Sequence, residues 1–156
     1  MFQIGQAIDI HRLKKTKEII NQKLGGFSVP TNWKVIAHSD GDLVLHAIAN
    51  AVLGSTQNLD IGHYFSDNDS NNKNIDSTHI INYALNELKK TKYELVNIDM
   101  TIVCENIMLS HFKQDIIKSI QTITKCQKVN VKATRFEHKS KFIECHVSLL
   151  VQKKGK

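Results

Sequence analysis

Two short motifs hold the residues whose types and spacing suggest chemistry. Asp9 and His11 are separated by one residue, and His46 follows in a later apolar stretch. Side chains alternate between the two faces of a β-strand, so an Asp-x-His pair on a strand presents both groups on one face. A third ligand from a nearby helix would complete three protein ligands with an open fourth position, which is the arrangement of a catalytic zinc. The sequence therefore predicts a metalloenzyme site.

Each of these pieces also has a simpler interpretation. A single Asp-x-His pair in a strand is usually coincidental, and a lone buried histidine usually makes a structural hydrogen bond. Asp60, Asp67 and Asp69, each taken alone, are better explained as solvated loop acids. The spacing by itself leaves both interpretations open.

The elements that must position these groups alternate between strand and helix patterns. They are, in order, a strand over 2–11, a hairpin within 17–30, a helix over 40–53, a polar loop over 55–75, a helix over 76–89, a strand over 96–104, a helix over 110–123, and strands over 129–135 and 142–151. This order predicts an α/β (α+β) fold. We expect a single domain over 1–156 with a mixed sheet of about four main strands and helices packed on one side.

Two local features refine this expectation near the site. Gly5 and Ala7 lie on the same strand face as Asp9, and such small residues would leave room there for something other than a core. Ser39 and Asp42 have the spacing of a capping box with Asp in place of Glu, which would anchor the turn into the first helix.

The composition bounds the class of protein. The chain has 156 residues, of which 41% are hydrophobic and 23% charged, as in a globular domain rather than a disordered one. No apolar run reaches membrane-spanning length, and no signal-peptide regions precede the first strand. The three cysteines are odd in number and widely spaced, which is typical of reduced thiols in the cytoplasm. The net charge is +6, but no basic helix with interleaved aromatic residues occurs, so we expect no nucleic-acid partner and no membrane partner.

The motifs taken together are far more specific than any one of them. They are Asp9-x-His11, Gly25-Gly26-x-x-x-Pro30, Ala37-His38-Ser39-Asp40-Gly41-Asp42 followed by His46, Asp60-Ile61-Gly62, Phe65-x-Asp67-x-Asp69, Asp76-Ser77, and Val129-Asn130-Val131-Lys132-Ala133-Thr134. In their order and spacing they resemble the 2-C-methyl-D-erythritol 2,4-cyclodiphosphate synthase family of the non-mevalonate isoprenoid pathway. The resemblance covers nearly the whole chain.

This resemblance implies a homotrimer with active sites at the subunit interfaces. The implied reaction cyclises 4-diphosphocytidyl-2-C-methyl-D-erythritol 2-phosphate with release of CMP. Carried over by position, Asp9, His11 and His46 would bind Zn²⁺, and His38 and Ser39 would hold the 2-phosphate. The residues implied to line the methylerythritol pocket are Asp60, Ile61, Gly62, Phe65 and Asp67. Glu137 would help bind Mg²⁺ or Mn²⁺ at the diphosphate, beside Thr134 and Arg135.

The nucleotide half of the sequence departs from the family pattern. The loop Cys104-Glu105-Asn106-Ile107-Met108-Leu109 is one residue shorter than usual and lacks the proline and basic residue. Arg135 stands where the family has a second threonine, the later Gly-Phe-x-Gly-Arg turn is absent, and Gln6-Ala7 replaces a common His-Gly. Two hypotheses follow: an active, divergent cyclase of the cytoplasm or of an organelle, or a catalytically impaired or altered trimeric zinc protein. A purely structural domain would bind no metal.

Overall fold

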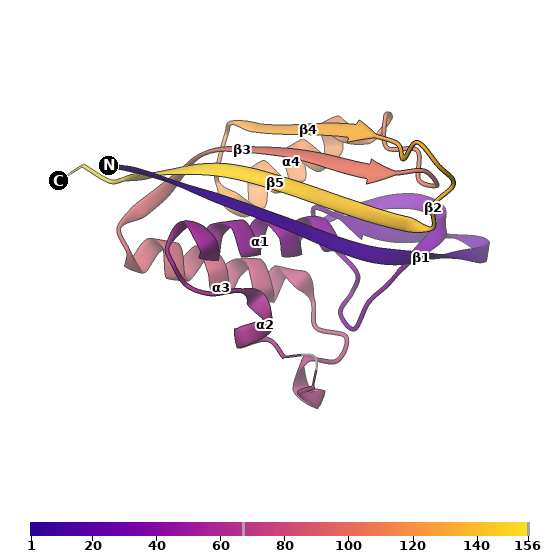
Figure 1. Ribbon diagram of the computed structural model, residues 1–156, viewed down its shortest axis with the longest axis horizontal. Helices are drawn as coiled ribbons and strands as arrows, with labels where there is room; N and C mark the ends of the chain where they lie inside the picture. The colour runs from indigo at the N-terminus through magenta and orange to yellow at the C-terminus, as the bar shows by residue number, and fades with distance from the viewer. Residues whose placement is uncertain (67, 156) are drawn as a thin grey trace.

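The computed structural model describes residues 1–66 and 68–155 as one α+β domain (Figure 1). Its strands are β1 (Phe2–Leu24), β2 (Phe27–Ile36), β3 (Tyr93–Cys104), β4 (Val129–Thr134) and β5 (Phe142–Lys153). Its α-helices are α1 (Leu43–Ser55), α2 (Ile61–Tyr64), α3 (Ser77–Lys90) and α4 (Lys113–Thr124), and a 3₁₀ turn covers Ser70–Asn72.

The sheet has the strand order β2-β1-β5-β3-β4. Only β3 and β4 run parallel, so the sheet is mixed, and the helices cover one of its faces (Figure 1). The predicted fold class is confirmed, although the sheet has five strands rather than about four. The first strand is also longer than predicted, because β1 continues through the polar residues 14–18 before it turns into β2.

The predicted hairpin is present, and its turn is tied to the start of α1. Gly25 and Gly26 have φ values of +65° and +79°, which glycine tolerates and other residues rarely adopt. Their N–H groups donate to the two carboxylate oxygens of Asp42 at 2.7 and 2.6 Å. Asp42 is fully buried and also accepts from the N–H of Leu45, so it is the N-cap of α1. The predicted capping box is therefore wrong, because Asp42 itself caps the helix while Ser39 Oγ accepts from the N–H of Gly41.

Gly5 serves the packing of α1 on the sheet rather than an open site. A Cβ atom at Gly5 would lie 1.9 Å from the carbonyl oxygen of Ala51, so the helix backbone rests directly on the strand. Ala7 is buried beneath the same helix. The expectation of free room at these two positions is wrong, because α1 fills it and thereby brings its own side chains next to the end of this strand face.

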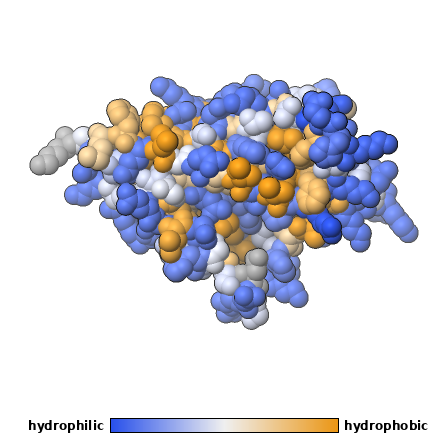
Figure 2. Space-filling view, viewed as in Figure 1, coloured by the Kyte–Doolittle hydropathy of each residue, from blue (hydrophilic) through white to orange (hydrophobic). Residues whose placement is uncertain are grey.

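Among the described residues, no helix covers the opposite face of the sheet (Figure 1); we call it the bare face. Phe2, Ile4, Ile8 and Ile10 are between 48% and 77% exposed, although they are apolar. Figure 2 shows apolar surface along the line of β1 among hydrophilic neighbours.

Within the part of the chain that the structure describes, no helix is both long and apolar enough to cross a membrane.

Candidate active site

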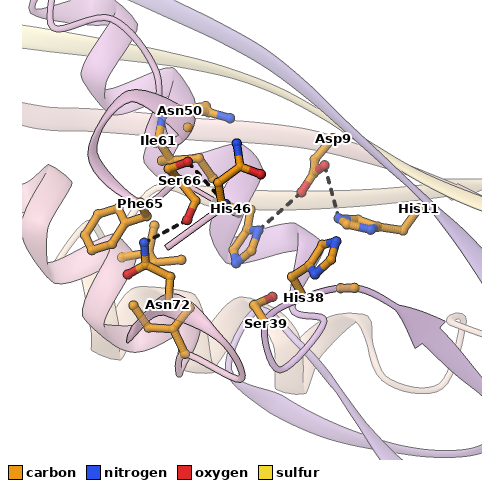
Figure 3. Close-up of a pocket in the computed structure, with 15 residues that line it drawn as sticks. Asp9, His11, His38, Ser39, His46, Asn50, Ile61, Phe65, Ser66 and Asn72 are labelled. Atoms are coloured by element: carbon orange, nitrogen blue, oxygen red, sulfur yellow. Dashed lines mark hydrogen bonds and ion pairs between the residues drawn. The ribbon is translucent and has the colours of Figure 1, made fainter. Parts of the chain in front are cut away.

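The three predicted metal ligands lie together at one end of the cavity in Figure 3. β1 presents Asp9 and His11 on its helix-covered face, and α1 presents His46 from its first turn. The potential ligand atoms all lie within 4.8 Å of one another. Asp9 Oδ1 is 3.3 Å from His11 Nε2, and Asp9 Oδ2 is 3.6 Å from His46 Nδ1. The carboxylate therefore stands between the two rings.

The chemistry of this set fits a zinc ion. One carboxylate and two imidazoles are ordinary zinc ligands, and three protein ligands leave a position for substrate. The ring nitrogen of His11 that points away from Asp9, Nδ1, lies 3.1 Å from the carbonyl oxygen of Ile36. Because a carbonyl only accepts, His11 Nδ1 carries the proton and Nε2 keeps a lone pair on the side of Asp9. Such a partner on the far nitrogen is the usual support of a metal-binding histidine.

The cavity beside these residues has a volume of about 470 Å³. The predicted residues that line it are Asp9, His11, His38, Ser39, His46, Ile61, Gly62 and Phe65. His38 is exposed, and its ring lies beside those of His11 and His46 in Figure 3. The structure thus brings the metal group and most of the expected methylerythritol pocket into one space.

Two residues that were predicted to line this pocket are not among the described residues that line the cavity. Asp60 does not line the cavity; it is the N-cap of α2, and its side chain accepts from the N–H of His63 at 3.1 Å. Its effect on the cavity is indirect, because α2 carries Ile61 and Gly62 into the wall. Asp67 lies outside the residues that the structure describes.

Sequence reasoning missed four polar residues of the same cavity: Asn50, Ser66, Asn68 and Asn72. Asn50 accepts from the N–H of Ile61 at 2.8 Å and so fastens α2 to α1. It lies four residues after His46, and residues at this spacing share a helix face. That spacing is the signal that would have found it. Asn72 donates to the carbonyl of Ser66 at 2.9 Å and closes the polar loop on itself.

The predicted nucleotide residues line a second, smaller cavity of about 210 Å³. Thr134 and Arg135 form one wall of it, and the loop of residues 104–110 forms the other. Asn106 Oδ1 in this loop is the buried side-chain oxygen that has no hydrogen-bond partner among residues 1–66 and 68–155. Glu137 is exposed and lines neither of these two cavities.

The two cavities lie on different strands of the sheet. β4 is three strands away from β1 in the sheet, and neighbouring strands lie about 4.8 Å apart. The metal group and Thr134 are therefore separated by roughly 14 Å along the sheet. Within one chain the two cavities are therefore separate.

Comparison with known proteins places the whole chain in one family. The sequence model of the YgbB family matches residues 2–152. The 2-C-methyl-D-erythritol 2,4-cyclodiphosphate synthase of Mycoplasmoides gallisepticum is 45% identical over 149 residues, covering 96% of both chains. A bifunctional IspD/IspF enzyme of Aliarcobacter butzleri is 37% identical over 87% of this chain and 36% of its own.

Solved structures share the fold over nearly the full length. The IspF of Plasmodium falciparum in complex with CDP matches with a TM-score of 0.84 and 31% identity, covering 99% of this chain and 97% of its own. The bifunctional IspDF of Campylobacter jejuni matches 99% of this chain and 43% of its own with a TM-score of 0.89 and 25% identity. The chain described here belongs to the YgbB family.

Proposed function

We propose that this chain is a 2-C-methyl-D-erythritol 2,4-cyclodiphosphate synthase. The observation that carries this proposal is the identity of 45% to such an enzyme over nearly all of both chains. In the reaction, an oxygen of the 2-phosphate attacks the β-phosphorus of the cytidine diphosphate group. A new P–O bond closes the ring, the bond from the β-phosphorus to the bridging oxygen breaks, and CMP leaves with that oxygen.

The protein needs no nucleophile of its own, because the attacking oxygen belongs to the substrate. Its contribution is positioning and charge stabilisation, as in other phosphoryl transfers. Zn²⁺ held by Asp9, His11 and His46 would act as a Lewis acid on a phosphate oxygen. Ser39 Oγ accepts from a backbone N–H, so its own proton remains to donate to the 2-phosphate, beside the imidazole of His38.

The methylerythritol part fits the apolar side of the first cavity. Phe65 contacts Tyr83 edge-on, with ring centroids 5.4 Å apart, so α3 fixes its orientation. Asn50 ties the first residue of α2 to α1, and Asp60 caps the same end of α2. These contacts give a preformed wall against which the sugar alcohol would be oriented.

The nucleotide would occupy the second cavity. Arg135 offers a planar guanidinium that suits two phosphate oxygens at once, in place of the threonine usual there. Thr134 adds a hydroxyl from the end of β4. Glu137 is exposed and would bind Mg²⁺ or Mn²⁺ together with oxygens that the diphosphate supplies.

We infer a homotrimer from the bare face of the sheet. Ile4, Ile8 and Ile10 are exposed on that face, and burying apolar surface of this kind favours association. We call Asp9, His11 and His46 with their cavity the metal region, and Thr134 and Arg135 with theirs the nucleotide region. Three chains packed through these faces would place the metal region of one chain near the nucleotide region of the next. In such a trimer the two regions of one active site would come from neighbouring chains.

The proposed compartment is the cytoplasm, or the interior of an organelle if a transit segment has been removed. Cys104, Cys126 and Cys145 are all free thiols and buried, which fits a reducing compartment. The proposed activity involves neither nucleic acid nor a membrane.

Incubation of the purified protein with the CDP-linked substrate, Zn²⁺ and Mg²⁺ tests the proposal. We expect CMP release that stops when a chelator removes the metals. A protein that holds zinc but releases no CMP above background would instead be the altered trimeric zinc protein, which the comparisons do not favour.

A further inference from the structure

A buried serine joins the metal region to the start of α3. Ser77 is the first residue of α3 and is fully buried. Its Oγ lies 2.8 Å from His46 Nε2 and also makes a very short contact with Asp40 Oδ1. Its backbone N–H donates to the other oxygen of Asp40 at 3.1 Å. The side chains of Asp40, Ser77 and His46 thus form one continuous chain of hydrogen bonds.

The direction of the protons in this chain follows from its chemistry. A carboxylate only accepts, so the single hydroxyl proton of Ser77 must point at Asp40. Ser77 Oγ is then left as an acceptor toward the ring. His46 Nε2 must therefore be the donor, which leaves Nδ1 as the atom that faces Asp9 without an obligatory proton.

We propose that Ser77 and Asp40 are positioning residues that fix His46 with its proton on Nε2 and thereby make Nδ1 the metal ligand. This inference rests on the metal site of the proposed function, and it assigns a role to two residues outside the metal group itself. A metal-binding imidazole with its second nitrogen held in this way keeps its ring orientation and gains basicity.

The carboxylate of Asp40 is itself held in place. Oδ1 accepts from the N–H of Asp42 at 3.2 Å, and Oδ2 lies 3.8 Å from Lys23 Nζ. Oδ2 therefore faces two donors, the ammonium of Lys23 and the N–H of Ser77. An asparagine whose oxygen stays with these two donors would place its NH₂ group at the Oδ1 position, where it faces Ser77 Oγ and displaces the bond from the N–H of Asp42.

This geometry makes Asp40→Asn a reversing substitution of nearly unchanged size. The amide NH₂ would donate to Ser77 Oγ, so the hydroxyl proton of Ser77 would turn toward His46 Nε2. His46 would then carry its proton on Nδ1, the atom needed for the metal. Ser77→Ala differs, because it removes the hydroxyl that faces His46 Nε2 but does not reverse the direction of the hydrogen bonds.

The test measures zinc affinity by chelator competition on the full-length protein, together with the protonated nitrogen of His46 by ¹H–¹⁵N correlation spectra of the metal-free form. We expect Asp40→Asn and Ser77→Ala to bind zinc about 10- to 100-fold more weakly. We expect the His46 proton on Nε2 in the wild type and on Nδ1 in Asp40→Asn. Thr78→Ala is the matched control, because the Thr78 hydroxyl donates its single proton to Asp76 Oδ1 at 2.8 Å, so its loss should leave zinc affinity unchanged.

Wild-type zinc affinity in both variants would overturn the proposal, as would a His46 proton that stays on Nε2 in Asp40→Asn. If Ser77→Ala fails to fold, Asp40→Asn still decides through the spectrum. Suppose that zinc affinity and the His46 proton change in the variants as expected, but the wild-type protein releases no CMP. That result would contradict the proposed function and leave this inference standing.

Discussion

The metal region and the nucleotide region differ in how far the chain itself provides hydrogen-bond partners for their side chains. In the metal region, His11 is bonded to Ile36 and His46 to Ser77, so both rings are oriented before any ligand arrives. In the nucleotide region, Thr134 and Arg135 are exposed, and Asn106 Oδ1 is buried with no hydrogen-bond partner among the described residues. The first region is preorganised within one chain, whereas the two predicted phosphate-binding side chains of the second are open to solvent.

The largest effect is expected from breaking the preorganised region at its centre. His46→Ala removes the ligand that α1 contributes, and we expect kcat to fall by at least about 100-fold, the size of effect that follows from small misplacement of reacting groups. Steady-state CMP release and elemental analysis of bound zinc measure it. His79→Ala, an exposed histidine of α3, should behave as the wild type. Full turnover in His46→Ala would remove the metal region from the mechanism.

The support beneath the metal region is expected to matter for stability. Asp42→Ala would leave the N–H groups of Gly25, Gly26 and Leu45 without their acceptor inside the protein. At about 1–3 kcal/mol for each buried donor, we expect the free energy of unfolding to fall by about 3 kcal/mol or more. Urea denaturation measures this loss. A loss below about 1 kcal/mol, the value of a single exposed cap, would show that the turn and helix are not clamped together.

The nucleotide region should respond to substitution through substrate binding. Arg135→Ala removes a charge-assisted phosphate contact, so we expect KM for the CDP-linked substrate to rise about tenfold while zinc affinity is unchanged. Lys154→Ala, far from both cavities, is the control for loss of one positive charge. An unchanged KM would mean that the diphosphate does not reach this wall.

The smallest predicted effect is a pH dependence from Asp42. Burial raises the pKa of this carboxyl to about 6 from its ordinary 3.8, against the backbone N–H groups that favour the charged form. The stability that comes from the protonated form is fully present below pH 3.8 and is lost as the pH rises through about 6. Between pH 5 and pH 7 the metal-free wild type should therefore lose about 1 kcal/mol relative to Asp42→Ala. Parallel pH profiles of the two unfolding free energies would contradict this.

Local sequence patterns predicted much of the fold. The hairpin within 17–30 and the helices over 40–53 and 76–89 were predicted from patterns among neighbouring residues, and the structure has β1–β2, α1 and α3 there. Gly5 was misinterpreted because the reason for it, the carbonyl of Ala51, lies far along the chain. The length of β1 was missed because its polar residues 14–18 do not alternate with apolar ones.

The residues of the site likewise divide into those that local spacing predicted and those that depend on contacts between distant parts of the chain. The spacing of Asp9 and His11 on one strand predicted that they share a face, and His46 was predicted as the third ligand from a nearby helix. The contact between Ser77 and His46 crosses from α3 to α1, so no spacing along the sequence reveals it. Asp60 was assigned to the pocket wall, and only the structure shows that it caps α2 instead.

Mixing two disabled variants tests most directly whether the two regions form one active site between neighbouring chains. His46→Ala damages the metal region, and a Thr134→Ala/Arg135→Glu double variant damages the nucleotide region. Co-refolded in equal amounts, their mixed trimers should regain CMP release, with about a quarter of the sites carrying both intact regions if chains combine at random. A mixture no more active than the two variants measured separately would contradict the shared site and confine the reaction to a single chain.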